Sequence, residues 1–214
     1  MNEPGGLRER KRERTHQAIS AAAITLFLDR GFDQVSVADI AAAAEVSKPT
    51  LFKYFASKEE LALHRIADHR EEAATVVRQR ATGQGPLAAL HRHFLDGLRD
   101  RDPVTGLNDH PRVLAYHRMI FATPSLRAAR LQYTEHDEQA LAEALDEYRG
   151  AAGPSGITAG LAAGQLIAVQ RVLARENWRR LVDGRSADQQ YDDAVAAADH
   201  AFDLLRRAYG EYYG

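Results

Sequence analysis

Cysteine is absent from the 214-residue sequence, which therefore can form neither a disulfide framework nor a metal site built on thiolates. An excess of one charge is also lacking, since 28 Lys and Arg oppose 30 Asp and Glu for a formal net charge of −2. The N-terminus reads MNEPGGLRERKRERTH, and its charges and missing apolar segment predict no signal peptide. These absences are compatible with a protein of the reducing cytoplasm.

Long uninterrupted hydrophobic runs are scarce as well. The most apolar stretch, residues 157–174, contains Thr158, Gln165, Gln170 and Arg171, so we expect a poor membrane span and no membrane partner. Hydrophobic residues nevertheless make up 45% of the chain and charged residues 27%. This balance predicts a water-soluble protein with a substantial core.

Helical periodicity dominates what is present, and no alternating strand pattern is convincing. In the first helix, apolar residues from Ile19 to Phe27 recur at spacings of three and four and form one stripe. A glycine-rich connector is expected at residues 150–156. The pattern predicts an all-α fold of about nine helices, at residues 8–29, 36–44, 48–55, 57–81, 86–100, 111–122, 124–149, 157–183 and 189–210.

The second and third helices carry the clearest start signals. Ser36 is followed by Asp39 in the capping-box arrangement, with Asp in place of the usual Glu. Ser47 can cap the third helix, and Pro49 falls in its first turn, where a missing N–H costs nothing. Only about four residues separate the two helices, so the pair predicts a helix-turn-helix.

A helix-turn-helix places its second helix in the major groove of DNA, with the N-terminal residues against base edges. The exposed candidates here are Lys48, Thr50, Lys53 and Tyr54, whereas Leu51 and Phe55 would hold the helix to the core. Lys48 and Thr50 can reach bases or phosphates. The alternative is a small helical corner whose lysines are merely solvated.

Other groups near these helices suit the phosphate backbone. Tyr54 and Lys58 can fix the register without reading sequence, and the helix starts at Ser36 and Ser47 present free N–H groups. Residues 1–14 add a weak basic arm, in which five Arg and Lys face three Glu. We therefore expect double-stranded DNA to be a partner.

The run GFDQVSVADIAAAAEVSKPTLFKYFASKEEL, residues 31–61, closely resembles the signature of the TetR family of transcriptional regulators. The resemblance implies an N-terminal DNA-binding domain at residues 1–60 and a homodimer on a palindromic operator. It also implies DNA contacts by a set of residues in the helix-turn-helix and just after it: Ser36, Val37, Lys48, Pro49, Thr50, Phe52, Tyr54 and Lys58.

Two positions depart from the family pattern. Glu45 stands in the turn where the family usually has Gly, and a left-handed backbone at a non-Gly residue costs about 1 kcal/mol. Phe52 stands where the family usually has Tyr, so it cannot offer a hydroxyl to phosphate and is left to pack against sugar or a base methyl.

For the remainder of the chain, the resemblance implies ligand binding and dimerisation by residues 61–214. The last two helices, at about residues 157–210, would form a four-helix bundle with those of a second copy. The apolar character of the first of these helices is compatible with an interface, because a helix that is apolar on more than one face is buried. Burial in the protomer's own core is the alternative.

The segment of residues 122–145 also resembles a TetR subgroup associated with acyl-CoA-like ligands. It points to a small amphipathic or acyl-type effector that releases a repressor from its operator. A pocket among the helices at residues 86–149 would be lined by apolar and aromatic side chains, although ordinary core packing is the alternative for each: Phe94, Leu98, Tyr116, Met119, Ile120 and Phe121.

Catalytic and metal chemistry find little support. None of the nine histidines has the four-residue spacing of a helical metal pair, so no metal or other cofactor is expected. No phosphate loop, nucleophile elbow or metallohydrolase motif appears, which argues against an enzyme. A helical DNA- or protein-binding module without ligand control is the remaining alternative.

Overall fold

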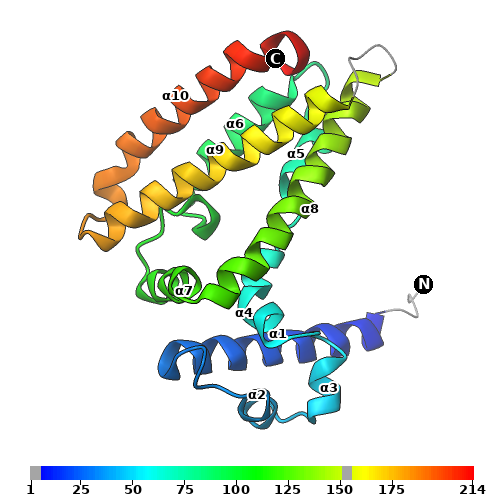
Figure 1. Cartoon of the computed structure of the whole chain (residues 1–214), viewed down its shortest axis with the longest axis vertical. Helices are drawn as coiled ribbons and strands as arrows, with labels where there is room; N and C mark the ends of the chain where they lie inside the picture. Colours follow the sequence, from blue (N-terminus) through cyan, green and yellow to red (C-terminus); the bar gives the residue numbers. More distant parts are fainter. Residues whose placement is uncertain (1–5, 151–155) are drawn as a thin grey trace. The chain divides into compact units, whose positions relative to one another are not determined.

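The computed structural model describes residues 6–150 and 156–214. Within these ranges the chain is helical and contains no strand, which confirms the predicted all-α class (Figure 1). The first residues of the predicted basic arm, 1–5, and most of the predicted connector, 151–155, lie outside the described residues. The helices, with one short 3-10 helix, are α1 (Gly6–Arg30), α2 (Val37–Ala43), α3 (Lys48–Phe52), α4 (Lys58–Ala67), α5 (Glu72–Gln79), α6 (Pro86–Arg99), η1 (Pro103–Thr105), α7 (Pro111–Ala122), α8 (Pro124–Arg149), α9 (Ile157–Val182) and α10 (Ala187–Tyr213).

Two compact units make up the chain. The first comprises residues 1–68 and 115–130, and the second comprises residues 69–114 and 131–214. The chain therefore passes between the units in the segment after α4 and again within α7 and α8.

The first unit packs α1 against α2 and α4, while α3 packs against α2. Its core contains the apolar stripe predicted for the first helix, and Ile19, Ala23 and Phe27 are at most 1% exposed. Gly31 ends α1 with a φ of 87° and donates its N–H to the carbonyl of Phe27 at 2.9 Å. This left-handed position explains the glycine at the helix end.

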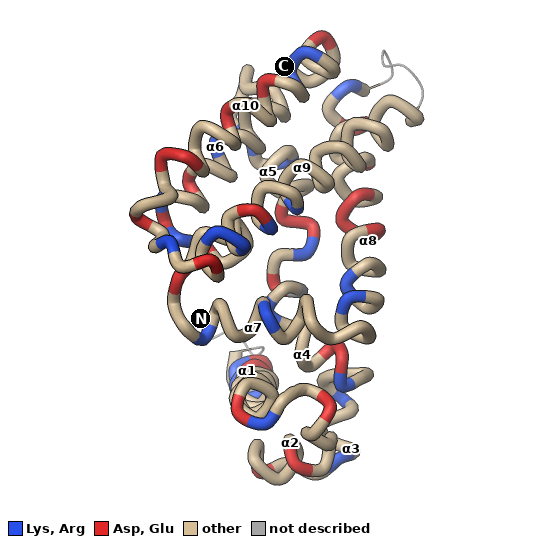
Figure 2. Tube along the Cα trace, turned by 60° about the vertical axis from the view of Figure 1, so that its left-hand side comes forward, with Lys and Arg blue, Asp and Glu red and all other residues tan. Residues whose placement is uncertain are grey.

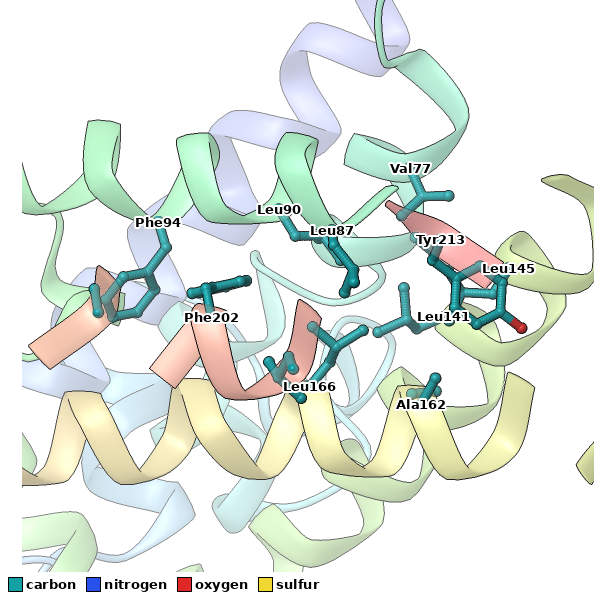
Figure 3. Close-up of a cluster of buried hydrophobic side chains, with 14 of the residues drawn as sticks. Val77, Leu87, Leu90, Phe94, Leu141, Leu145, Ala162, Leu166, Phe202 and Tyr213 are labelled. Atoms are coloured by element: carbon teal, nitrogen blue, oxygen red, sulfur yellow. The ribbon is translucent and has the colours of Figure 1, made fainter. Parts of the chain in front are cut away.

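The second unit is built on α6, α9 and α10, and α5 packs on α6. Figure 3 shows leucines of α6 and α8, Leu166 of α9 and Phe202 of α10 converging on one apolar cluster. Tyr213, at the end of α10, closes the same cluster and is 1% exposed. The last predicted helix thus has the right location but is longer than residues 189–210, because Ser186 caps it earlier with a capping box to Gln189.

One predicted helix is wrong. The sequence pattern favours a single helix over residues 57–81, but the structure breaks it into α4 and α5. Glu71 lies between them in the left-handed region, with a φ of 57°. No glycine or proline marks the break, and the contacts that stabilise it come from α8, so the local sequence could not reveal it.

Helix α9 differs from expectation in its membrane character. By length and composition it could cross a membrane, since its best 18-residue window has a mean hydropathy of 1.4. The prediction of a poor span rested on its polar side chains, which are too few to lower this average. In the second unit, α9 packs on α10 and η1, and Ala159, Ala162 and Leu166 are fully buried.

Candidate nucleic-acid interface

Helix α2 begins at the predicted capping box. The Ser36 backbone N–H donates to Asp39 Oδ2 at 2.8 Å, and the Asp39 N–H donates to Ser36 Oγ at 3.1 Å. Hydrogen bonds from the Ser36 hydroxyl and N–H lower the pKa of the Asp39 carboxyl. Two otherwise unpaired donors are satisfied in this way, which fixes the start of the helix.

Ser47 caps the start of helix α3, as predicted. Ser47 Oγ accepts the Thr50 N–H at 3.1 Å and lies 2.8 Å from Thr50 Oγ1, so the two hydroxyls are hydrogen-bonded to each other. Pro49 occupies the first turn. The helix is shorter than residues 48–55, because the backbone of Lys53–Phe55 leaves it as a turn.

The faces of α3 divide sharply. Leu51 is fully buried and Phe55 is 2% exposed, which confirms that this pair holds the segment to the core. Lys48, Pro49 and Lys53 are exposed, and Phe52 is 50% exposed despite its aromatic ring. Figure 2 shows blue, the colour of Lys and Arg, at α3. An exposed surface that is both cationic and aromatic suits a nucleic acid, which offers phosphates to the lysines and apolar sugar and base groups to the ring.

The remaining predicted contact residues surround this surface. Ser36 and Ser47 are exposed, Val37 and Thr50 are half-buried, and Tyr54 is half-buried. All of them belong to the first unit, so the structure brings the whole predicted set into one folded body.

Lys58 has a structural role that the sequence did not reveal. Its Nζ donates to the carbonyls of Phe32 and Val35, at 2.8 and 3.0 Å, and lies 4.1 Å from the centre of the Phe32 ring. The ammonium therefore ties α4 to the segment between α1 and α2. One of its three N–H groups is left for a phosphate.

The turn between α2 and α3 contains Glu45, whose φ of 53° is left-handed. Its N–H donates to the carbonyl of Ala42, and the next N–H, of Val46, donates to that of Ala41. The turn thus has the left-handed conformation that favours Gly, the residue that the family usually has at this position. Glu45 also adds a negative charge close to the cationic face of α3.

Replacing Glu45 by Gly is expected to stabilise the first unit by about 1 kcal/mol, because Gly adopts a positive φ without the Cβ clash. Urea-induced unfolding measures the change. Glu45→Ala is the matched control, since it removes the same carboxylate but keeps the Cβ. Equal stabilities of the Gly and Ala variants would show that the backbone is not the cause.

A cluster of aromatic rings lies behind α3. His16 of α1 stacks on Phe55, with ring centres 4.6 Å apart, and meets the edge of His64 of α4 at 4.4 Å. Burial lowers the pKa of His64. The signal for this packing in the sequence is the position of His16, which lies one turn before Ile19 on the same apolar stripe.

The six residues predicted to line a ligand pocket are divided between the two units. Phe94 and Leu98 belong to the core of the second unit, where Phe94 packs near Phe202. The other four lie on the part of α7 that belongs to the first unit, namely Tyr116, Met119, Ile120 and Phe121. Neither unit by itself therefore brings the predicted set together.

The α7 group contains polar chemistry that sequence reasoning missed. Tyr116 donates its hydroxyl to the carbonyl of Ala62 at 2.7 Å. His117 packs near Phe121, and burial, followed by the charge of Arg130, lowers its pKa to about 4. Arg130 itself lies 5.4 Å from the centre of the Phe121 ring. A neutral, half-buried imidazole thus lies on this helix.

The described part of the chain holds no group of three or more His, Asp or Glu side chains that could bind a metal ion. The basic arm is better defined: within α1, Lys11, Arg12 and Arg14 are exposed. Glu9 and Glu13 are interleaved with them and exposed as well, so the arm is of mixed charge.

The segment that contains this site is similar to that of known proteins. Residues 19–64, which include α2 and α3, match the family described as bacterial regulatory proteins, tetR family. The chain is 33% identical over 202 residues to the HTH-type transcriptional regulator TcmR of Streptomyces glaucescens, which covers 94% of this chain and 87% of that protein. It is 29% identical over 136 residues to the HTH-type transcriptional repressor LfrR of Mycolicibacterium smegmatis, over 63% of this chain and 65% of LfrR.

Solved structures agree in fold. A TetR-family regulator from Mesorhizobium loti matches 92% of this chain and 96% of its own, with a TM-score of 0.58 and 19% identity. NalD of Pseudomonas aeruginosa, the secondary repressor of the MexAB-OprM multidrug efflux pump, matches 91% of this chain and 96% of its own, with a TM-score of 0.56 and 21% identity. At these identities the likeness concerns the fold alone.

Proposed function

Because the chain belongs to the tetR family of bacterial regulatory proteins, we propose that it is a homodimeric repressor that leaves a palindromic operator when a small molecule binds. It is a DNA-binding transcriptional regulator and not an enzyme. The proposal assigns DNA binding to residues 1–60 and effector binding and dimerisation to residues 61–214. It also places the protein in the cytoplasm, where its DNA lies.

The observation that carries the DNA contact is the outward face of α3. Lys48 and Lys53 are exposed beside a half-exposed Phe52, on a helix whose opposite face is buried. In the proposed complex Lys48 and Thr50 meet base edges, while Tyr54, Lys58 and the helix starts at Ser36 and Ser47 meet phosphates. Phe52, Val37 and Pro49 supply apolar contact to sugar or base methyl groups, and Lys53 adds charge.

The dimer is supported by the outer face of α9. Ile157, Leu161 and Val172 are 68, 54 and 63% exposed. Leu161 follows Ile157 by four residues, and Val172 follows Leu161 by eleven. These spacings are close to one and three helical turns, so the three side chains lie along one face. Residues 157–170 carry no charge, which is visible as a continuous tan stretch of α9 in Figure 2.

On α10, Leu204 adds a further exposed apolar side chain, with 51% of its surface accessible. A second copy of α9 and α10 covers such residues in the proposed four-helix bundle. This occupant also explains the membrane-like hydropathy of α9 without a bilayer, because an obligate protein interface is as apolar as a protein core.

The effector is proposed to be a small amphipathic or acyl-type molecule. The support is the resemblance of residues 122–145 to a subgroup with such ligands, together with the half-buried Met119 and Phe121 on α7. The test is a titration of fatty acyl thioesters and free fatty acids into the protein–operator complex, read by fluorescence anisotropy. Release at micromolar ligand supports this class, and unchanged anisotropy with the whole series removes it.

Operator binding is expected to weaken steeply with salt. In each copy Lys53 and Lys58 would contact phosphates, and Lys48 would bring its charge between them at the base edges. The two copies would thus displace about six counterions, each of which contributes about −0.9 to the slope of log affinity against log salt. Between 50 and 200 mM salt the affinity should therefore fall by about 10³. Anisotropy titrations over this range measure the slope, and a flat plot would contradict the proposed contacts.

A further inference from the structure

The joint between α4 and α5, residues 68–71, contains neither Gly nor Pro, the two residue types that usually break a helix. Its sequence is Asp-His-Arg-Glu, and the backbone of Glu71 has a left-handed φ of 57°. Residues that carry a Cβ rarely adopt this conformation. A conformation that the local sequence disfavours persists only when the surrounding structure holds it. The joint also contains the point, between Asp68 and His69, at which the chain passes from the first unit to the second.

Helix α8 holds Glu71 through two consecutive residues. The Glu71 backbone N–H donates to Asp137 Oδ1 at 3.0 Å. Its side chain, through Oε1, pairs with His136 Nε2 at 2.7 Å. Burial raises the pKa of the Asp137 carboxyl, and the Glu71 N–H opposes that shift. Both the backbone and the side chain of the strained residue are therefore attached to one helix.

Helix α6 holds the next residue. Glu72 Oε1 lies 3.3 Å from His93 Nε2, while Glu72 Oε2 lies 2.9 Å from His69 Nδ1. Hydrogen bonds from His69 and then His93 lower the pKa of Glu72 to about 2. The hydrogen bond to Glu72 raises the pKa of His93, and the nearby Asp102 and Asp96 raise it further.

These residues form what we call the joint cluster: His69, Glu71, Glu72, His93, His136 and Asp137. Two more charged groups act on it, because Arg70, which lies over the Tyr133 ring at 5.2 Å, and Arg78 carry positive charge near Asp137 and Glu71. All of these residues belong to the second unit. The cluster joins three segments through carboxylate–imidazole pairs, and imidazole is the type of side chain whose unperturbed pKa lies near neutral pH.

We propose that the joint cluster is a pH-dependent fastening, which holds the α4–α5 joint most firmly to α6 while His93 is protonated and loosens as His93 loses its proton. The central pair is Glu72 with His93, and Glu71 with His136 supports it. Deprotonation of His93 removes the imidazolium charge and leaves the ionised Glu72 carboxylate only a hydrogen bond from a neutral imidazole, so the attraction between opposite charges is lost. The joint then opens more often, although the rest of the second unit keeps its core.

The direction follows from the two members of the central pair. The pKa of His93 is higher in the folded protein than in the unfolded chain, so its contribution is complete below about pH 6.5 and disappears as the pH rises through the raised value. The pKa of Glu72 is lowered to about 2, so its contribution is complete above about pH 4.5 and disappears only as the pH falls toward 2. The fastening is therefore strongest in the mildly acidic range and weaker at pH 8.5.

The test is hydrogen–deuterium exchange of the full chain without DNA, at pH 6.0 and 8.5, corrected for the chemical exchange rate at each pH. For peptides covering residues 69–79, protection is expected to fall about tenfold at pH 8.5, whereas peptides of α10 should keep theirs. Unchanged protection of residues 69–79 in the wild-type protein would overturn the proposal. This comparison needs no variant and no operator, so failure of the proposed function leaves it interpretable.

The variant that assigns the effect is His93→Gln, because glutamine can donate to Glu72 but cannot be protonated. We expect its residues 69–79 to exchange at both pH values as the wild type does at pH 8.5. His200→Gln on α10 is the matched control, since His200 is exposed and outside the cluster, and should behave as the wild type. A tenfold fall that persists in His93→Gln would overturn the role of the Glu72–His93 pair. An NMR titration gives a second readout, in which Glu72→Gln should lower the pKa of His93.

Discussion

Replacing Lys48 by alanine is expected to weaken operator binding by about 1–3 kcal/mol, which is roughly 5- to 150-fold. Lys48 is the first residue of α3, and its side chain is exposed, so its removal should leave the fold of the first unit intact. What is lost is a base or phosphate contact at the tip of the proposed recognition helix. Thr50→Ala should cost a similar amount, because Thr50 is expected to meet a base edge from the same turn.

Fluorescence anisotropy with labelled operator at fixed salt measures both losses. Arg99→Ala is the matched control, since it also removes one exposed positive charge, but from α6 in the second unit. Circular dichroism should give the same helix content for all three variants. Wild-type affinity in both Lys48→Ala and Thr50→Ala would remove α3 as the recognition helix.

Replacing Val172 by glutamate is expected to raise the dissociation constant of the dimer at least 100-fold. Val172 is 63% exposed on the outer face of α9, so the substitution costs the isolated protomer little. In a twofold-symmetric bundle, each copy would contribute one unpaired carboxylate to an apolar interface, and unfavourable charge placements of this kind cost several kcal/mol. Operator affinity should fall in parallel, because a monomer contacts only one half-site.

Sedimentation velocity at micromolar concentration distinguishes the two states. Val104→Glu is the matched control: Val104 is 45% exposed, is also an apolar residue, and lies on η1, outside the proposed interface. It should leave the dimer unchanged. A wild-type protein that sediments as a monomer, or a Val172→Glu variant that remains a dimer, would contradict the interface on α9 and α10.

The features that sequence reasoning predicted correctly depend on near neighbours in the chain. Ser36 and Ser47 start α2 and α3 because each hydroxyl accepts an N–H three residues later. The inward spacing of Leu51 and Phe55 is likewise a property of a single short segment. Glu45 was recognised as a departure from a family pattern, and its left-handed φ follows from the turn that the pattern specifies.

The features that the sequence did not predict depend on residues far apart in the chain. The break at Glu71 is held by His136 and Asp137, 65 and 66 residues away. Lys58 resembles a solvated lysine until the carbonyls of Phe32 and Val35 are brought to its ammonium. The predicted pocket residues share an apolar or aromatic character, yet α6 and the later part of α7 belong to different units. Periodicity identifies apolar faces but does not say which partner covers each one.

The central claim is that α3 reads a DNA sequence for a dimeric regulator. Selection of bound fragments from a randomised DNA pool, followed by hydroxyl-radical and dimethyl-sulfate footprinting of the enriched site, tests it most directly. We predict an inverted repeat whose half-sites are protected in successive major grooves, with protection of the guanines lost in Lys48→Ala. Enrichment of no sequence, or an identical footprint in Lys48→Ala and the wild type, would contradict the account.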